Sequence, residues 1–278
     1  MTTASVGTDL ELPRAPAADA AARPWRGAAL RAGLVWTLVR TDFKARYHGS
    51  IGGFVWALLK PLSMFVVLMA VFSFLFASNP TYKLDLIVGL FLWDFFAEAT
   101  KTGLTSLHAK GYLLTKARFP SWILVVSSIS NAVITLIVFV GIITLFLVAA
   151  GRPPRPDAVL LFAAYCAALI AIVIGFSLAT SVLFLRYRDL NQVWDVAVQA
   201  GFFVAPIIYP LGIIPERFHL YLYVWPPTPV IEFSRAVLVS GVRPTATAHL
   251  CLAIDVAICL AAGIGLFARF SPRAAEYL

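Results

Sequence analysis

The stretch SWILVVSSISNAVITLIVFVGIITLFLVAAG, residues 121–151, decides the class of fold because it contains no charged residue. A helix needs about 20 consecutive apolar residues to cross the hydrocarbon core of a bilayer, and this stretch exceeds that length. Residues 61–82, 158–185 and 196–215 are free of charge as well. The sequence therefore predicts an all-α integral membrane protein.

Two further apolar segments carry acids. Asp94 and Glu98 lie within residues 84–105, and Asp255 lies within residues 248–270. Ionisable groups at such depth must face protein or water, so we expect these acids and Asp195 to be bonded structural groups or to line a polar cavity. With these segments we predict six transmembrane helices, at about 54–78, 84–105, 121–150, 158–185, 192–214 and 248–270.

Composition excludes several classes of protein. Of the 278 residues, 60% are hydrophobic and 13% are charged, whereas a typical soluble domain has about 25% charged residues. The mean hydropathy is +0.86. Cys166, Cys251 and Cys259 lie in apolar stretches without metal-ligand spacing. A soluble enzyme, a disordered chain, a disulfide scaffold and a metal site are therefore not expected.

The net charge of +8 is best explained by membrane topology. With six spans, fifteen Lys and Arg residues fall on the side of the termini and six on the opposite side. Cytoplasmic loops carry such an excess, so both termini are predicted to be cytoplasmic and nucleic acid is not needed to explain the charge. Lys60, inside the first span, is expected to extend its amine toward the membrane surface.

The N-terminal region divides into two parts. Residues 1–28 are predicted to form a disordered cytoplasmic tail, and residues 29–278 a single membrane domain. Residues 31–48 place an apolar stripe of Trp36, Val39, Phe43 and Tyr47 on one helical face, flanked by basic side chains. A helix lying in the membrane interface fits this pattern, and a solvated connector is the alternative.

Two other segments are not simple spans. Residues 101–120 are basic with interspersed leucines, which fits either a short cytoplasmic helix that docks a partner or a solvated loop. Residues 201–230 are apolar but rich in proline, which predicts a re-entrant external hairpin of short helices between the fifth and sixth spans. Its aromatic side chains could anchor at the outer interface or stack on sugar rings.

Motifs for catalysis and energy supply are absent from the sequence. It contains no Gly-Lys-Ser or Gly-Lys-Thr of a phosphate-binding loop, no His-Glu-x-x-His zinc motif and no Gly-x-Ser-x-Gly nucleophile motif. We therefore do not expect an enzyme. A pump built from this chain would need its energy from elsewhere.

Six motifs in order resemble the membrane subunits of bacterial polysaccharide-export ABC transporters, the Wzm-like, TagG-like and KpsM-like permeases. DFKARYHGSIGGFVWALLKPL, residues 42–62, is similar to the entry of their first span. The other five are GLFLWDFFAEA (89–99), KGYLLTKARFP (110–120), RYRDL (186–190), APIIYPLGIIPE (205–216) and PPTPVIEFSRAVL (226–238). The departures include Leu92 for a common Pro, Lys110 for Asn and Pro226 for Asn.

The resemblance implies a homodimer in the bacterial inner membrane that encloses a channel for a lipid-linked glycan. It also implies a separate dimeric ABC ATPase, so ATP and Mg would bind to that partner and no cofactor directly to this chain. ATPase coupling would involve Lys110, Lys116, Arg118 and Phe119. The interface helix would offer Arg40, Lys44, Arg46 and Tyr47 to the lipid pyrophosphate. The channel and external gate would use Trp56, Trp93, Tyr209, Tyr221, Tyr223 and Trp225.

The function expected from this resemblance is ATP-driven export of a lipid-linked polysaccharide of the O-antigen, galactan, teichoic acid or capsule type. Three alternatives remain. The chain could belong to an ABC exporter of a small lipid or drug. It could be a secondary transporter driven by protons through Asp94, Glu98 or Asp255, although no inverted repeat is visible. A membrane enzyme acting on lipid-linked sugars would need a converging acid or histidine cluster, which the sequence lacks.

Overall fold

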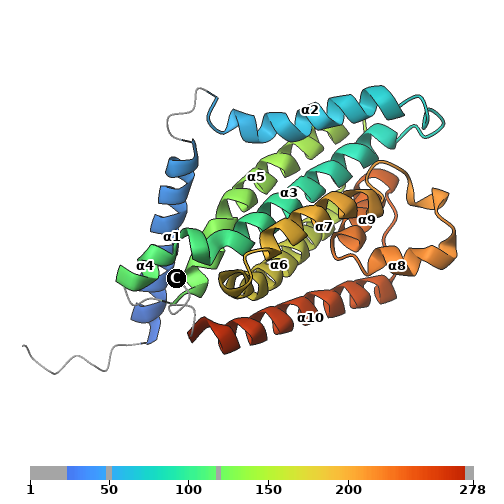
Figure 1. The fold of residues 1–278 in the computed structure, drawn as a ribbon. Helices are drawn as coiled ribbons and strands as arrows, with labels where there is room; N and C mark the ends of the chain where they lie inside the picture. The colour runs from blue at the N-terminus through green and yellow to red at the C-terminus, as the bar shows by residue number, and fades with distance from the viewer. Residues whose placement is uncertain (1–23, 48–51, 117–119, 273–278) are drawn as a thin grey trace, which may run out of the picture.

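The computed structural model describes residues 24–47, 52–116 and 120–272, and within them all regular structure is helical. The long helices lie side by side, and α1 crosses one end of them (Figure 1). This confirms the all-α class. The helices are α1 (Pro24–Tyr47), α2 (Val55–Phe72), α3 (Tyr82–Ala109), α4 (Gly111–Lys116), α5 (Trp122–Ala149), α6 (Pro156–Arg186), α7 (Leu190–Val204), α8 (His219–Tyr223), α9 (Pro227–Arg235) and α10 (Ala246–Phe270).

Helix α3 is the central element of the fold. It contacts α2, α5, α6, α7 and α9, and nearly every residue from Leu86 to Phe96 is buried. A helix that is apolar all round is stable only when neighbours cover it on every side, which the run LIVGLFLW achieves here. Helix α10 packs along α6, and α1 packs against the first part of α5.

The two ends of the bundle differ. Helices α1 and α4 and the C-terminal end of α10 lie at one end, whereas the α2–α3 connection and α8 lie at the other (Figure 1). A hydrogen bond of 2.6 Å between the hydroxyls of Ser121 and Ser271 joins the start of α5 to the end of α10. We refer to the end with α1 and α4 as the α1 end and to the other as the α8 end.

Four helices are long and apolar enough to cross a membrane, namely α2, α5, α6 and α10. They correspond to four of the six predicted spans. Helix α3 has 28 residues, as α5 has, but it carries Asp85, Asp94, Glu98 and Lys101. Helix α7 has 15 residues, about 22 Å, which is shorter than the roughly 30 Å hydrocarbon core. Six spans therefore stay a prediction.

Three predicted boundaries are wrong. The segment 192–214 is not one helix, because α7 ends at Val204 and Ala205 is extended with ψ 134°; Pro206 disfavours a helical residue before it. Helix α2 ends at Phe72, and residues 73–78 form turns. Helix α1 begins at Pro24, so residues 24–28 are helical and not part of a tail; residues 1–23 lie outside the described part of the chain.

Candidate functional site

A charged stripe runs along one face of α3. Asp94, Glu98, Lys101 and Thr105 are spaced four, three and four residues apart, which places them above one another on a helix. Asp94 lies near the midpoint of α3, and Thr105 lies near its end at the α1 end of the bundle. We call these four residues the α3 stripe. It extends over half of the helix.

Each charged member of the stripe is paired with a residue from another helix. Asp94 forms an ion pair of 3.6 Å with Lys60 of α2, Glu98 accepts a hydrogen bond from Arg46 of α1, and Lys101 donates to Asp195 of α7 at 2.6 Å. The three pairs thus join α3 to α1, α2 and α7. Asp94, Glu98 and Asp195 are bonded groups, as the sequence predicted. The Lys60 amine, which was expected to extend toward the membrane surface, lies 3.6 Å from the Asp94 carboxylate.

The stripe is open to its surroundings. The side chain of Lys60 is 78% exposed, that of Lys101 is 51% exposed, and Asp94 is still 21% exposed near the middle of α3. Lipid does not solvate charges at such depth, so exposed ion pairs require water or another protein next to them. The surface between α2 and α7 is therefore the one part of this site that is suited to a polar passage.

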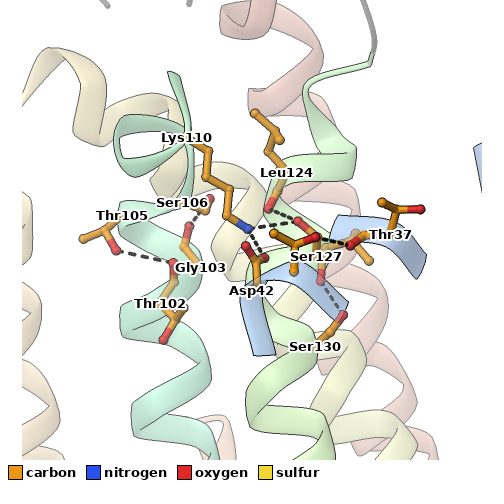
Figure 2. Close-up of polar contacts among 12 residues, drawn as sticks. Thr37, Asp42, Thr102, Gly103, Thr105, Ser106, Lys110, Leu124, Ser127 and Ser130 are labelled. Carbon is orange, nitrogen blue, oxygen red and sulfur yellow. Dashed lines mark hydrogen bonds and ion pairs between the residues drawn. The ribbon is translucent and has the colours of Figure 1, made fainter. Parts of the chain in front are cut away.

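A second polar site connects α1 to the junction of α3 and α4. Lys110, the residue between these two helices, donates its amine to the carboxylate of Asp42 in α1 and to the hydroxyl of Ser127 in α5 at 3.1 Å. Figure 2 shows the Lys110 amine pointing between these two acceptors. The Lys110 and Asp42 side chains are only 15% and 21% exposed. Lys110 therefore links the junction of α3 and α4 to both α1 and α5.

The indole and phenyl rings near α3 form a cluster inside the subunit. Trp225 lies within 6.1–6.4 Å of Trp93, Phe96 and Trp194, measured between ring centroids. Its ring also covers Gly201 of α7, where a side chain would collide with it. Trp93 is only 5% exposed. In this conformation Trp93 and Trp225 pack against other rings of the same subunit, and their place in a channel stays a prediction.

Arg235 organises the segment at the α8 end. Its guanidinium donates to the backbone carbonyls of Asp85 at 2.8 Å, Ile207 at 2.9 Å and Pro206, and to the Glu232 carboxylate at 2.8 Å. The residue is 7% exposed. These bonds hold the chain after α7 and the start of α3 against α9, where Arg235 also lies against Gly89. The proline-rich segment is therefore anchored on the half of α3 nearest the α8 end.

A small polar cavity of about 260 Å³ lies beside this anchor and includes Tyr82, Asp85, Tyr209, Glu232 and Arg235 in its wall. Tyr82 donates to the carbonyl of Ile208 at 2.9 Å, and Tyr209 to that of Phe203 at 2.9 Å. Burial, followed by the nearby Glu232 carboxylate, raises the pKa of Tyr209. The Tyr209 hydroxyl is thus bonded to the end of α7 in this conformation.

The remaining predicted site residues have different surroundings. Arg40 and Lys44 are exposed on α1, whereas Arg46 forms an ion pair with Glu98. Tyr47 packs between Phe43 and Phe54 with centroid distances of 4.9 and 5.3 Å. Trp56 is 61% exposed, and Tyr223 is half-buried beside Phe233. Arg118, Phe119 and the side chains of Lys116 and Tyr221 lie outside what the structure describes.

Sequence reasoning missed three partners and one role. Asp42, Ser127 and Asp195 were not expected to bind Lys110 or Lys101, because the sequence does not tell which helices are neighbours. Arg235 was visible only as a member of the motif at residues 226–238, with no role attached to it. Lys110 was expected to contact an ATPase, but its amine is bound within the subunit.

The bundle of apolar helices with an open charged stripe defines a multi-pass membrane protein of the transport type. Residues 33–239 match the family described as ABC-2 type transporter. Because that match covers most of the sequence, the chain belongs to the ABC-2 transporter family. Its homologues are permease subunits, and it is a permease of the Wzm and KpsM kind.

Several relatives match nearly the whole chain. An O-antigen export system permease protein RfbA of Klebsiella pneumoniae is 26% identical over 246 residues, which is 88% of this chain and 95% of the relative. An O-antigen export system permease protein RfbA of Myxococcus xanthus is 28% identical over 66% of this chain and 71% of its own length. The polysialic acid transport protein KpsM of Escherichia coli is 20% identical over 84% and 92%.

Proposed function

We propose that this chain is the membrane subunit of an ATP-driven exporter that moves a lipid-linked polysaccharide from the cytoplasmic to the outer face of the inner membrane. The observation that carries the proposal is the similarity, over nearly the full length, to permeases named for O-antigen export. A polysaccharide of the O-antigen, capsule, teichoic acid or galactan type is the substrate class. The α1 end then faces the cytoplasm.

The α3 stripe supports a location for the polysaccharide path. The stripe begins near the middle of α3 and is open toward the α1 end, whereas α9 and its Arg235 cover the outer half of the same helix. A path along the stripe is thus open to the cytoplasm and closed at the outer side by the anchored segment. Ion pairs and hydroxyls offer a glycan many exchangeable hydrogen bonds, which permits sliding without tight binding.

The path needs a second wall, and a second copy of the chain supplies it. The surface beside the stripe also carries exposed apolar residues, with Val67 and Val71 on α2 and Val196 on α7. In a homodimer these faces of α2 and α7 would lie against the partner and enclose the two stripes. Exposed ion pairs such as Lys60–Asp94 would then face a shared aqueous interior.

The α1 end is the surface proposed for a separate ABC ATPase, which binds ATP and Mg. Helix α4 projects there, and Lys110 connects its start to α1 and α5. Closure of the ATPase dimer would move α4, and the Asp42–Lys110 pair would pass that movement to α1. Arg46–Glu98 connects α1 in turn to the α3 stripe.

Asp42→Asn should therefore uncouple ATP hydrolysis from export. The complex should still assemble and hydrolyse ATP, while export of the polysaccharide should fall severalfold because Lys110 loses its charged partner. Exchanging the charges in Asp42→Lys with Lys110→Asp should recover part of the export. Asp157→Asn, which removes an acid from an exposed pair with Arg243, is the matched control and should have no effect. Equal export by Asp42→Asn and the control would contradict the coupling role.

Arg40 and Lys44 are proposed to attract the pyrophosphate of the lipid carrier, since both are exposed at the membrane surface and each such charge contributes about 1 kcal/mol of attraction to anionic lipid. Arg40→Gln with Lys44→Gln should lower export severalfold at unchanged assembly. Arg217→Gln with Arg243→Gln removes the same charge at the α8 end and should leave export intact. Unchanged export by the first pair would remove the assigned role.

Deletion of the gene in its own host tests the proposed function. We expect surface polysaccharide to disappear and lipid-linked polymer to accumulate on the cytoplasmic side, with recovery when the chain is supplied in trans together with an active ATPase. If surface polysaccharide persists while sensitivity to drugs or the membrane lipid content changes, the chain belongs to an exporter of small molecules and the proposal is wrong.

A proton-driven secondary transporter is the second candidate, and the ion pairs argue against it. Asp94 and Glu98 are each already paired with a cation, and Asp255 lies on α10, far along the sequence from the stripe. Export into inverted vesicles should therefore require ATP and should persist after a protonophore collapses the proton gradient. Loss of export under the protonophore at full ATP would favour the proton-driven alternative.

A further inference from the structure

A crevice of about 570 Å³ opens between α2, α3 and α5 at the α8 end of the bundle. This volume is in the range of sites that take small molecules. Phe65 and Met69 of α2 form one wall, and Phe146 and Ala149 of α5 form the other. Phe65 and Phe146 meet edge to face with 5.6 Å between their centroids, which closes the crevice on the side of the bundle interior.

The crevice is apolar within and basic at its rim. Lys83, in the first turn of α3, and Arg152, just after α5, both line it and both are exposed. Among the residues that the structure describes, no carboxylate forms an ion pair with either of them. Arg152 donates one bond, of 3.4 Å, to the carbonyl of Val239. The carboxylate of Asp85 accepts a bond from Thr81 and lines the other cavity beside Arg235, and it interacts with Arg152 only at longer range.

We propose that this crevice binds an anionic glycerophospholipid of the surrounding membrane. Apolar walls below two exposed cations without an ion-paired carboxylate match the chemistry of such a lipid, whose acyl chain lies beneath a phosphate at the membrane surface. The cations sit at the ends of α3 and α5, at the level where headgroups meet water, and the aromatic walls lie deeper. The assignment of this lipid to the outer leaflet rests on the orientation given under the proposed function, whereas the site itself does not.

The lipid would have a structural consequence for α2. Of the four candidate spans, only α10 is less buried than α2. Within the subunit, α2 packs mainly against α3. A phospholipid wedged between α2 and α5 would fix α2 against the bundle and hold Lys60 next to Asp94. The site differs from the α3 stripe in its position along α3, because the crevice is lined by Lys83 and Leu84 at the α8 end, whereas the stripe begins at Asp94 near the middle of the helix.

The experiment uses the full chain in complex with its ATPase, purified in detergent. Dioleoyl phosphatidylglycerol or dioleoyl phosphatidylcholine is added, and bound lipid is measured by native mass spectrometry together with the thermal midpoint. Wild type should retain more phosphatidylglycerol than phosphatidylcholine, and phosphatidylglycerol should raise its thermal midpoint. Lys83→Gln with Arg152→Gln should bind it roughly tenfold more weakly and lose that gain. Arg155→Gln with Arg217→Gln, equal in charge, should behave like wild type.

A second variant tests the apolar part of the site without changing charge. Ala149→Phe, at an exposed position in the wall, should fill the crevice and abolish retention of phosphatidylglycerol while the complex still assembles. Three results would overturn the proposal. The first is equal retention of phosphatidylglycerol by the Lys83/Arg152 variant and its control, and the second is a change of oligomeric state in Ala149→Phe, which would assign the crevice to a second copy. The third is preferential retention of undecaprenyl phosphate over phosphatidylglycerol. None of these results depends on export, so this test is separate from that of the proposed function.

Discussion

Arg235→Met should destabilise the subunit more than any other single replacement of a charged residue. The guanidinium donates to three backbone carbonyls and one carboxylate in a nearly closed environment. Its removal leaves those acceptors unsatisfied and Glu232 buried without its partner. Loss of one member of a buried pair costs about 3–5 kcal/mol. We expect the free energy of unfolding, measured by denaturant titration in detergent micelles, to fall by that amount.

Arg235→Lys should rescue little of this loss. An ammonium group is a single point charge and does not reproduce the fork that reaches four acceptors in different directions. The matched control is Arg243→Gln, because Arg243 is on the same side of the bundle but is 69% exposed and pairs only with Asp157. Such surface pairs contribute about 0–1 kcal/mol. If both variants lower stability equally, the Arg235 anchor does not hold the segment.

Gly263→Val should displace α10 from the bundle. Helix α10 packs along α6 with the backbone of Gly263 directly against that of Gly175, and Gly175 in turn lies against the backbone at Cys259. Membrane helices gain their association from such close approach of small residues. A side chain at Gly263 would meet backbone atoms, which do not rotate aside. Overpacking of this kind costs about 1–3 kcal/mol for small additions, and valine should lie at the upper end.

Gly265 offers a control two residues further along the same helix. A side chain added at Gly265 meets nothing within 4 Å. Gly265→Val should thus leave the elution volume and the thermal midpoint of the purified protein close to wild type, while Gly263→Val lowers the midpoint and yields aggregated protein. Similar behaviour of the two variants would mean that the glycine contact does not hold α10 in place.

The sequence predicted the apolar helices well because length and absence of charge are local properties. The spans expected at 121–150 and 158–185 agree within two residues with Trp122–Ala149 and Pro156–Arg186. The expectation for 192–214 was wrong because apolar residues continue past Val204 although Pro206 stops the helix. Hydrophobicity alone does not separate a helix that crosses the membrane from one that ends inside it.

The candidate site was less predictable because it depends on which helices are neighbours. Arg46 and Glu98, Asp42 and Lys110, and Lys101 and Asp195 are separated by 52, 68 and 94 residues along the chain. No local sequence pattern indicates that such distant residues form a pair. The sequence shows where the aromatic residues lie along the chain. A tryptophan that packs inside a subunit and one that faces a channel, however, have the same apolar neighbours in sequence. Sequence alone therefore does not decide between these two positions for Trp93 and Trp225.

Photocrosslinking during export tests most directly the claim that polysaccharide passes along the α3 stripe. A photoreactive amino acid would replace Lys60, beside Asp94, or Ile258, which is 61% exposed on α10, on the opposite side of the bundle from α2. With ATP supplied, position 60 should capture lipid-linked polysaccharide, and position 258 should capture only membrane lipid. Capture of polysaccharide at position 258, or none at position 60 while export continues, would contradict the claim.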